Sequence, residues 1–194
     1  MGFRLYPIFI KCQNTLYSDK DILNIIGKGS LKKSKTVTFY QTSKPKENIF
    51  IGTEGTTKII VNRDLAFSAF EDENIFLQLK DCEVVSMIWD ETGNISGFSL
   101  IENGRLMRKI LACDGDIRED FGNPIQEELE IDEENILPKE EVTEIIESEG
   151  VEGFKKILKE VVIDNVVNNL AKRYVGERLL NLSRREKIEM NKYE

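Results

Sequence analysis

Apolar residues in the first two thirds of the chain form short runs between turn residues, and each run is rich in β-branched or aromatic side chains. This pattern is typical of β-strands. The strands that we predict are residues 3–12, 36–42, 48–52, 57–61, 84–89, 95–101 and 105–113. Ser18 and Asp21 have the spacing of a capping box, which predicts a short helix closed by Gly27. Residues 63–80 fit a short helix followed by a strand.

The dipeptide Asn103-Gly104 separates two of these runs and predicts a two-residue hairpin turn, because such a turn needs positive φ at both positions. The turn fixes a register in which Ser99 lies opposite Arg108. One face of the hairpin is then the expected core face, with Phe98, Leu100, Met107 and Leu111.

The last third of the chain has the periodicity of helices. Pro138 suits the start of a helix and Gly150 suits its end. Apolar residues then recur at the helical period from residue 152 to about residue 181. A second capping box at residues 183–186 predicts a short final helix or a fraying tail.

These elements predict an α+β fold, with an antiparallel β-sheet, helices packed on one side of it and a helical C-terminal extension. We expect residues 1–135 to form the β-rich core and residues 136–194 to form a helical region that packs on the same domain.

The composition of the chain excludes several functional classes. The 194 residues include 27 Lys and Arg against 35 Asp and Glu, a formal charge of −8, and no histidine. An acidic chain is a poor general binder of nucleic acid. Without histidine there is neither a Ser-His-Asp triad nor a His-ligated metal site. No apolar run approaches the ~18 residues of a membrane span. We predict no membrane contact, no cofactor and no catalytic residue.

The cysteines are Cys12, Cys82 and Cys113. An odd number without Cys-x-x-Cys spacing indicates neither a disulfide framework nor a zinc ribbon. We therefore expect three reduced thiols in a cytoplasmic protein.

Negative charge is concentrated between residues 114 and 149. This segment contains fifteen acidic residues and only two basic ones, Arg118 and Lys139, so that its charge is 2 − 15 = −13. Such a surface would attract a basic protein partner. The candidate partner-binding residues are Asp114, Asp116, Glu119, Asp120, Glu127 and Glu130.

The beginning of this segment, residues 114–120, is similar to the opening of a calcium-binding loop. It departs from the calcium-loop pattern at two required positions. Arg118 stands where an Asp or Asn is needed, and Glu119 stands where a Gly is needed. We predict no metal site there.

Arg108 lies on a predicted strand between Leu106 and Ile110. A buried guanidinium needs a paired carboxylate. We expect Glu128, or another acid of residues 114–134, to form a structural ion pair with Arg108. The alternatives are an exposed Arg108 and an Arg108 that binds a ligand.

Four short motifs lie between residues 84 and 130. They are Trp89-Asp90-x-x-Gly93, Gly97-Phe98-Ser99, Asn103-Gly104-x-Leu106-x-Arg108 and Gly122-Asn123-Pro124-Ile125-x-x-Glu128. In this order they resemble a pattern in uncharacterised bacterial proteins, some of which are suspected of lying near toxin–immunity loci. The resemblance implies a strand meander and an immunity-like role, but no activity, cofactor or catalytic residue.

Together these observations predict a non-enzymatic binding module with an acidic surface. One alternative is a hydrolase that depends on paired carboxylates or a bound cation. Another is a structural homo-oligomer, in which the C-terminal helix pairs with a second copy through Leu158, Val162, Val166 and Leu170.

Overall fold

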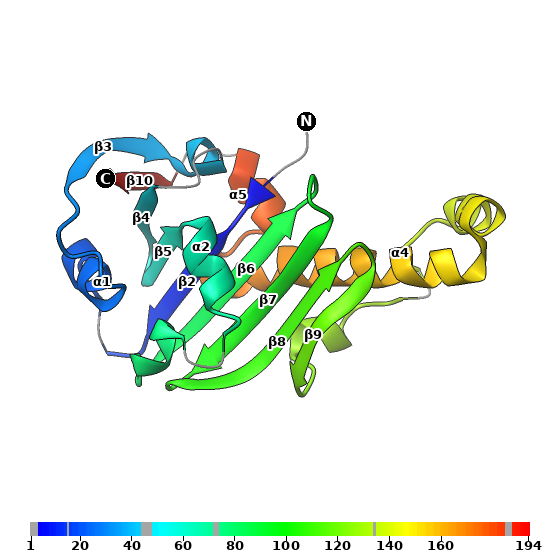
Figure 1. Cartoon of the computed structure of the whole chain (residues 1–194), viewed down its shortest axis with the longest axis horizontal. Helices are drawn as coiled ribbons and strands as arrows, with labels where there is room; N and C mark the ends of the chain where they lie inside the picture. Colours follow the sequence, from blue (N-terminus) through cyan, green and yellow to red (C-terminus); the bar gives the residue numbers. More distant parts are fainter. Residues whose placement is uncertain (1–3, 15, 44–47, 72–73, 134, 185–187) are drawn as a thin grey trace.

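The computed structural model describes residues 4–14, 16–43, 48–71, 74–133, 135–184 and 188–194 (Figure 1). Its strands are β1 Arg4–Leu5, β2 Pro7–Cys12, β3 Lys33–Thr38, β4 Ile49–Glu54, β5 Thr57–Val61, β6 Cys82–Asp90, β7 Ile95–Glu102, β8 Arg105–Cys113, β9 Asp116–Gly122 and β10 Glu189–Tyr193. Its helices are α1 Asp19–Ile25, α2 Arg63–Ser68, α3 Gln126–Leu129, α4 Lys139–Val175 and α5 Leu179–Arg184, with the 3₁₀ helices η1 Phe39–Ser43 and η2 Ile75–Gln78.

The strands form one sheet in the order β3-β10-β4-β5-β2-β6-β7-β8-β9, and β1 adds to β6. Every strand pair among the described residues is antiparallel. The predicted α+β class and antiparallel sheet are confirmed. The predicted capping box is also present, because the Asp21 amide donates to Ser18 Oγ and the Ser18 amide donates to the Asp21 carboxylate.

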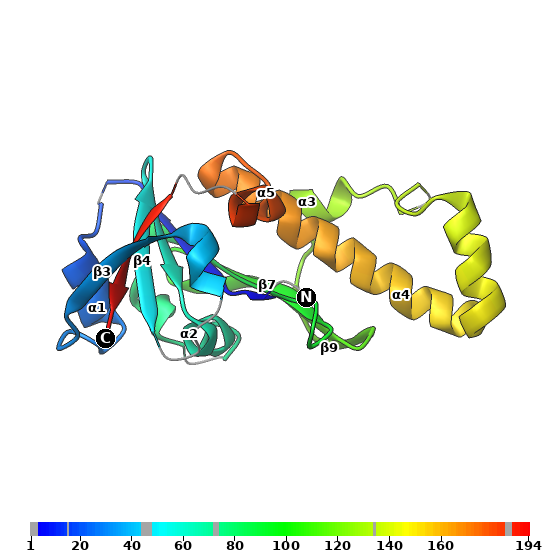
Figure 2. The ribbon, with the colours of Figure 1, turned by 90° about the horizontal axis from the view of Figure 1, so that it is seen from above.

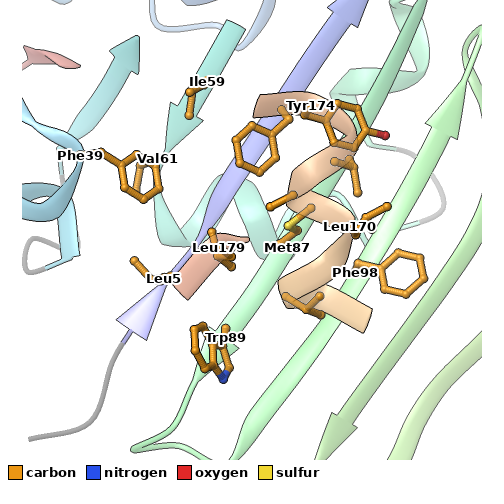
Figure 3. Packing of buried hydrophobic residues seen from close by; sticks show 14 of the residues in the cluster. Leu5, Phe39, Ile59, Val61, Met87, Trp89, Phe98, Leu170, Tyr174 and Leu179 are labelled. Atoms are coloured by element: carbon orange, nitrogen blue, oxygen red, sulfur yellow. The ribbon is translucent and has the colours of Figure 1, made fainter. Parts of the chain in front are cut away.

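Helices cover both faces of the sheet, and the expectation of one covered side is therefore wrong. Alternate residues of the central strands point to opposite faces, as the pleat requires. Phe9, Val85 and Met87 pack with α4 and α5, whereas Ile8 and Val84 pack with α1, α2 and η2. Figure 1 shows α2 in front of the sheet and α4 behind it, and Figure 3 shows Leu170 of α4 near Met87 and Phe98.

The last residues form a strand inside the sheet, whereas we expected a helical region over residues 136–194. Strand β10 lies between β3 and β4 and pairs with both. Met190 of β10 is fully buried in the same core as α4. Part of the predicted capping box at residues 183–186 lies outside the described residues.

The predicted hairpin turn is present, with positive φ at Asn103 and Gly104. The register is as predicted only next to the turn, because a β-bulge at Met107 shifts it by one residue. Arg108 therefore lies opposite Leu100, and not opposite Ser99. The bulge moves Met107 out of the expected core, and the Met107 side chain is 45% exposed as a result.

Two of the three cysteines form a disulfide bond, contrary to the expectation of three reduced thiols. Cys12 ends β2 and Cys82 begins β6, and the two residues lie directly opposite each other in the sheet. Cys113 is a free thiol. The cysteines therefore do not support the cytoplasmic location that we predicted from them. No helix of the described residues is both long enough and apolar enough to cross a membrane.

The position of β10 can be tested by truncating Met190. We expect Met190→Ala to lower the free energy of unfolding by about 2–5 kcal/mol, because it leaves a cavity in a packed core. Glu189→Ala, at an exposed neighbouring position, is the control and should change it by less than about 0.5 kcal/mol. Urea unfolding measures both. Equal, small effects would contradict the burial of β10 in the sheet.

Candidate functional site

The most distinctive feature outside the sheet is a helical arm that projects beyond it, which Figure 2 shows from above. We define the arm as residues 131–133 and 135–158. Its first helical part ends at Gly150, where a φ of 72° and a ψ of 176° break the helix. A positive φ favours glycine, and the chain there turns back towards the sheet. The predicted helix boundaries at Pro138 and Gly150 are thus both present in the structure.

Arg108 fixes one side of the arm's base. Its Nε and NH2 atoms donate to the two Glu128 carboxylate oxygens at 2.9 and 2.7 Å. Its NH1 atom donates to Asp120 and to the Phe121 carbonyl at 3.0 Å. The Arg108 residue is only 3% exposed. The expected ion pair with Glu128 is therefore present, and it ties α3 to β8. The hydrogen bonds to Glu128 hold the pKa of Arg108 above its usual value.

Arg173 near the end of α4 fixes the other side. Its Nε and NH2 atoms donate to Glu127 of α3 at 3.0 and 2.6 Å, and its NH1 atom lies 3.5 Å from Glu83 of β6. The neighbouring Tyr174 hydroxyl also donates to Glu83. Burial, together with the charge of Glu83, raises the pKa of Tyr174. Glu127 and Glu128 thus bind two different cations and hold α3 between them.

Two further acids of β9 contact lysines of the same chain. Asp116 lies 3.0 Å from Lys156 of α4, and Glu119 lies 3.4 Å from Lys109. The hydrogen bond from Lys156 lowers the pKa of Asp116. Asp120 and Glu127 form ion pairs as well. Four of the six predicted partner-binding acids are therefore paired with cations of the same molecule.

The other two predicted residues accept hydrogen bonds, Asp114 from Asn94 Nδ2 at 3.3 Å and Glu130 from Gln126 Nε2 at 2.6 Å. Both side chains belong to exposed residues. The six predicted residues do not form one unpaired acidic surface, because most of their charge is balanced by nearby cations of the same chain. That these six residues bind a partner stays a prediction.

Five further acidic residues lie on the first helical part of α4. They are Glu140, Glu141, Glu144, Glu147 and Glu149. All five are exposed, and the structure gives none of them a cationic partner among the described residues. Ile146, which is 37% exposed, lies on the same helical part, and Val151, which is 56% exposed, follows Gly150 directly. Glu140, Glu144 and Glu147 share one helix face. This spacing, between the helix boundaries at Pro138 and Gly150, can be recognised in the sequence.

A groove lies where the arm meets the sheet. Two hollows of ≈ 230 and ≈ 260 Å³ share Glu133, Val162 and Ile163 in their walls. The first also has Leu129, which is 74% exposed. The groove adds apolar surface to the base of the arm.

The residues predicted to pair the C-terminal helix with a second copy differ in how exposed they are. Val166 and Leu170 are 1% and 0% exposed because they pack on the sheet of their own chain. They are not available to a second copy. Leu158 and Val162, nearer the arm, are half-buried.

A separate hollow of ≈ 160 Å³ lies beside the turn between β6 and β7. Its walls include Trp89, Ser96, Glu160 and Asp164. Burial raises the pKa of Asp164 to about 6, although hydrogen bonds from Ser96 and Trp89 partly oppose this effect. Among the described residues, no group of three His, Cys, Asp or Glu side chains is placed to hold a metal ion.

No family model, curated protein or solved structure matches this chain. The resemblance of residues 84–130 to bacterial proteins near toxin–immunity loci stays a prediction.

The ion pair at the base of the arm can be tested by removing Arg108. We expect Arg108→Ala to lower the free energy of unfolding by about 3 kcal/mol, because Glu128 would remain largely buried without its cation. Arg118→Ala is the control, since that side chain is 57% exposed and should contribute less than about 0.5 kcal/mol. Denaturant unfolding of the two variants measures the difference. Similar values would contradict a structural role for Arg108.

The raised pKa of Asp164 predicts a dependence of stability on pH. Between pH 4 and 6 the folded chain holds a proton at Asp164 that the unfolded chain has lost, so this residue makes the protein less stable as the pH rises through that range. Asp164→Asn should therefore raise the free energy of unfolding at pH 7 by about 1–2 kcal/mol. The gain should disappear near pH 4. Asp81→Asn, at an exposed position, is the control, and a gain independent of pH would contradict the assignment.

Proposed function

We propose that this protein is a non-enzymatic binding module that presents the arm to a basic protein partner. The observation that carries the proposal is the set of five glutamates between Lys139 and Gly150, which are exposed and lack cationic partners among the described residues. Unpaired carboxylates on a projecting helix speed the approach of a cationic surface and select against acidic ones.

The arm also offers the apolar contact that a specific interface needs. Ile146 and Val151 are exposed beside the glutamates. Interfaces commonly place apolar side chains at the centre and charged groups around them. A partner with cationic residues around an apolar site is therefore complementary to the arm.

The proposal includes an immunity-like role, in which the arm covers the basic cleft of a nuclease. The acidic arm and the resemblance of residues 84–130 support this role. The salt bridges of Arg108 and Arg173 also support it, because they hold the base of the arm and reduce the entropy that binding would cost.

A charge-neutralised arm tests the proposal. We expect the triple variant Glu140→Gln, Glu144→Gln, Glu147→Gln to bind the partner at least about tenfold more weakly at low salt, because three attractive charges are lost. Capture from the source cell identifies the partner, and calorimetry with that purified partner measures the affinity. Binding by the unaltered protein should weaken as salt screens the charges.

The matched control is the triple variant Glu54→Gln, Glu71→Gln, Glu189→Gln, which removes the same charge from exposed positions outside the arm. It should bind as the unaltered protein does. Equal weakening by both variants would show an effect of net charge alone. If the arm variant binds with unchanged affinity, or if salt has no effect, the arm is not the binding surface.

A further inference from the structure

The Cys12–Cys82 disulfide lies at the edge of a hollow that solvent can enter. The hollow has a volume of ≈ 330 Å³, and both cysteines line it together with Lys11, Gln13, Glu83 and Arg173. This volume is within the range of small-molecule pockets. Cys12 is half-buried, whereas Cys82 is only 3% exposed. A small reagent can therefore approach the disulfide from the side of Cys12.

The same hollow contains the anchor of α4. Glu83 follows Cys82 directly in β6, accepts the Tyr174 hydroxyl hydrogen bond and lies 3.5 Å from Arg173 NH1. Arg173 in turn binds Glu127 of α3. The disulfide is thus one residue away from the contacts that hold the end of α4 and the base of the arm.

We propose that Cys12–Cys82 is a thiol–disulfide exchange site for small dithiols in the folded protein, and that its redox state controls how firmly the end of α4 is held. This inference does not depend on whether the arm binds a partner.

The reaction needs a dithiol as its reductant. The thiolate of the dithiol attacks Cys12 Sγ, the bond between the two cysteine sulfurs breaks, and Cys82 leaves as a thiolate that takes a proton from water. The second thiol of the reagent then attacks the reagent sulfur that is bonded to Cys12 Sγ in the mixed disulfide. A cyclic disulfide forms and Cys12 leaves as a thiol. The dithiol loses two electrons and the protein gains them.

Reduction should loosen the strand ends without separating the strands. The Gln13 amide donates to the Asp81 carbonyl at 3.2 Å, and the Asn103 amide donates to the Cys82 carbonyl at 2.9 Å. These bonds remain when the disulfide is broken. The covalent constraint on Cys82 is lost, and Glu83, the next residue, becomes freer to move. The expected consequence is local opening at the end of α4, since such openings are drawn from the least constrained parts of a structure.

The experiment uses the full chain carrying Cys113→Ser, so that any thiol detected comes from the disulfide. Native protein is treated with dithiothreitol, and its thiols are counted with a thiol reagent before and after denaturation. Amide hydrogen exchange then compares the oxidised and reduced proteins. We expect the Cys12 thiol to react in the native reduced protein and both thiols to react after denaturation. We also expect exchange about three- to tenfold faster in residues 170–175 and in α3.

Strand β10 is the internal control, because it is separated from β2 and β6 by β4 and β5 in the sheet. Its exchange should be unchanged. The inference is overturned if the Cys12 thiol reacts only after denaturation, if exchange at the end of α4 is unaffected, or if β10 and α4 change equally. The double variant Cys12→Ser, Cys82→Ser should reproduce the reduced state. If that variant does not fold, the comparison of oxidised and reduced protein decides alone.

Discussion

The packing of α4 on the sheet determines where the proposed binding surface lies. The straight part of α4, residues 151–175, is about 38 Å long at 1.5 Å per residue. Its buried residues begin only at Ile163 and continue to Tyr174. The second half of this helix therefore stabilises the molecule through core contacts. The first half is less buried: it lies along the edge strand β9, where Lys156 contacts Asp116, and its N-terminal end continues past β9 into the arm. An arm is the geometric consequence of a helix longer than the surface that it covers.

The distribution of charge follows the same division. Where α3 and α4 meet the sheet, carboxylates bind cations of the chain, as Glu128 binds Arg108 and Glu127 binds Arg173. These pairs are largely withdrawn from solvent, and losing one partner is costly there. Beyond the sheet the glutamates of α4 remain in water, where an unpaired carboxylate carries no such cost. The same acidic composition thus has a structural role at the base and stays available to a partner on the arm.

Sequence reasoning was most successful where local chemistry decides the structure. The turn at Asn103-Gly104, the capping box at Ser18 and the helix boundaries at Pro138 and Gly150 each follow from a few neighbouring residues. It was wrong where distant segments decide. Strand β9 is acidic and does not have the composition of a strand, but Arg108 and Lys109 on β8 bind its acids.

The bulge at Met107 and the strand β10 show the same limitation. A register derived from a turn holds only until an extra residue enters one strand, and no pattern in residues 105–113 marks that residue. Strand β10 has little apolar content, and its place is set by pairing with β3 and β4. The disulfide likewise depends on β2 and β6 being neighbours, a contact between residues separated by 70 positions.

Tyr174 connects these long-range contacts. Its ring stacks on Phe9 of β2 at 5.6 Å, its carbonyl accepts a hydrogen bond from Thr57 of β5 at 2.7 Å, and its hydroxyl donates to Glu83 of β6. Three strands therefore hold one residue at the end of α4. Because the arm is the opposite end of the same helix, a small displacement at Tyr174 would become a larger displacement at the arm. The strand ends around Glu83 are thus one of the places where the sheet fixes the position of α4.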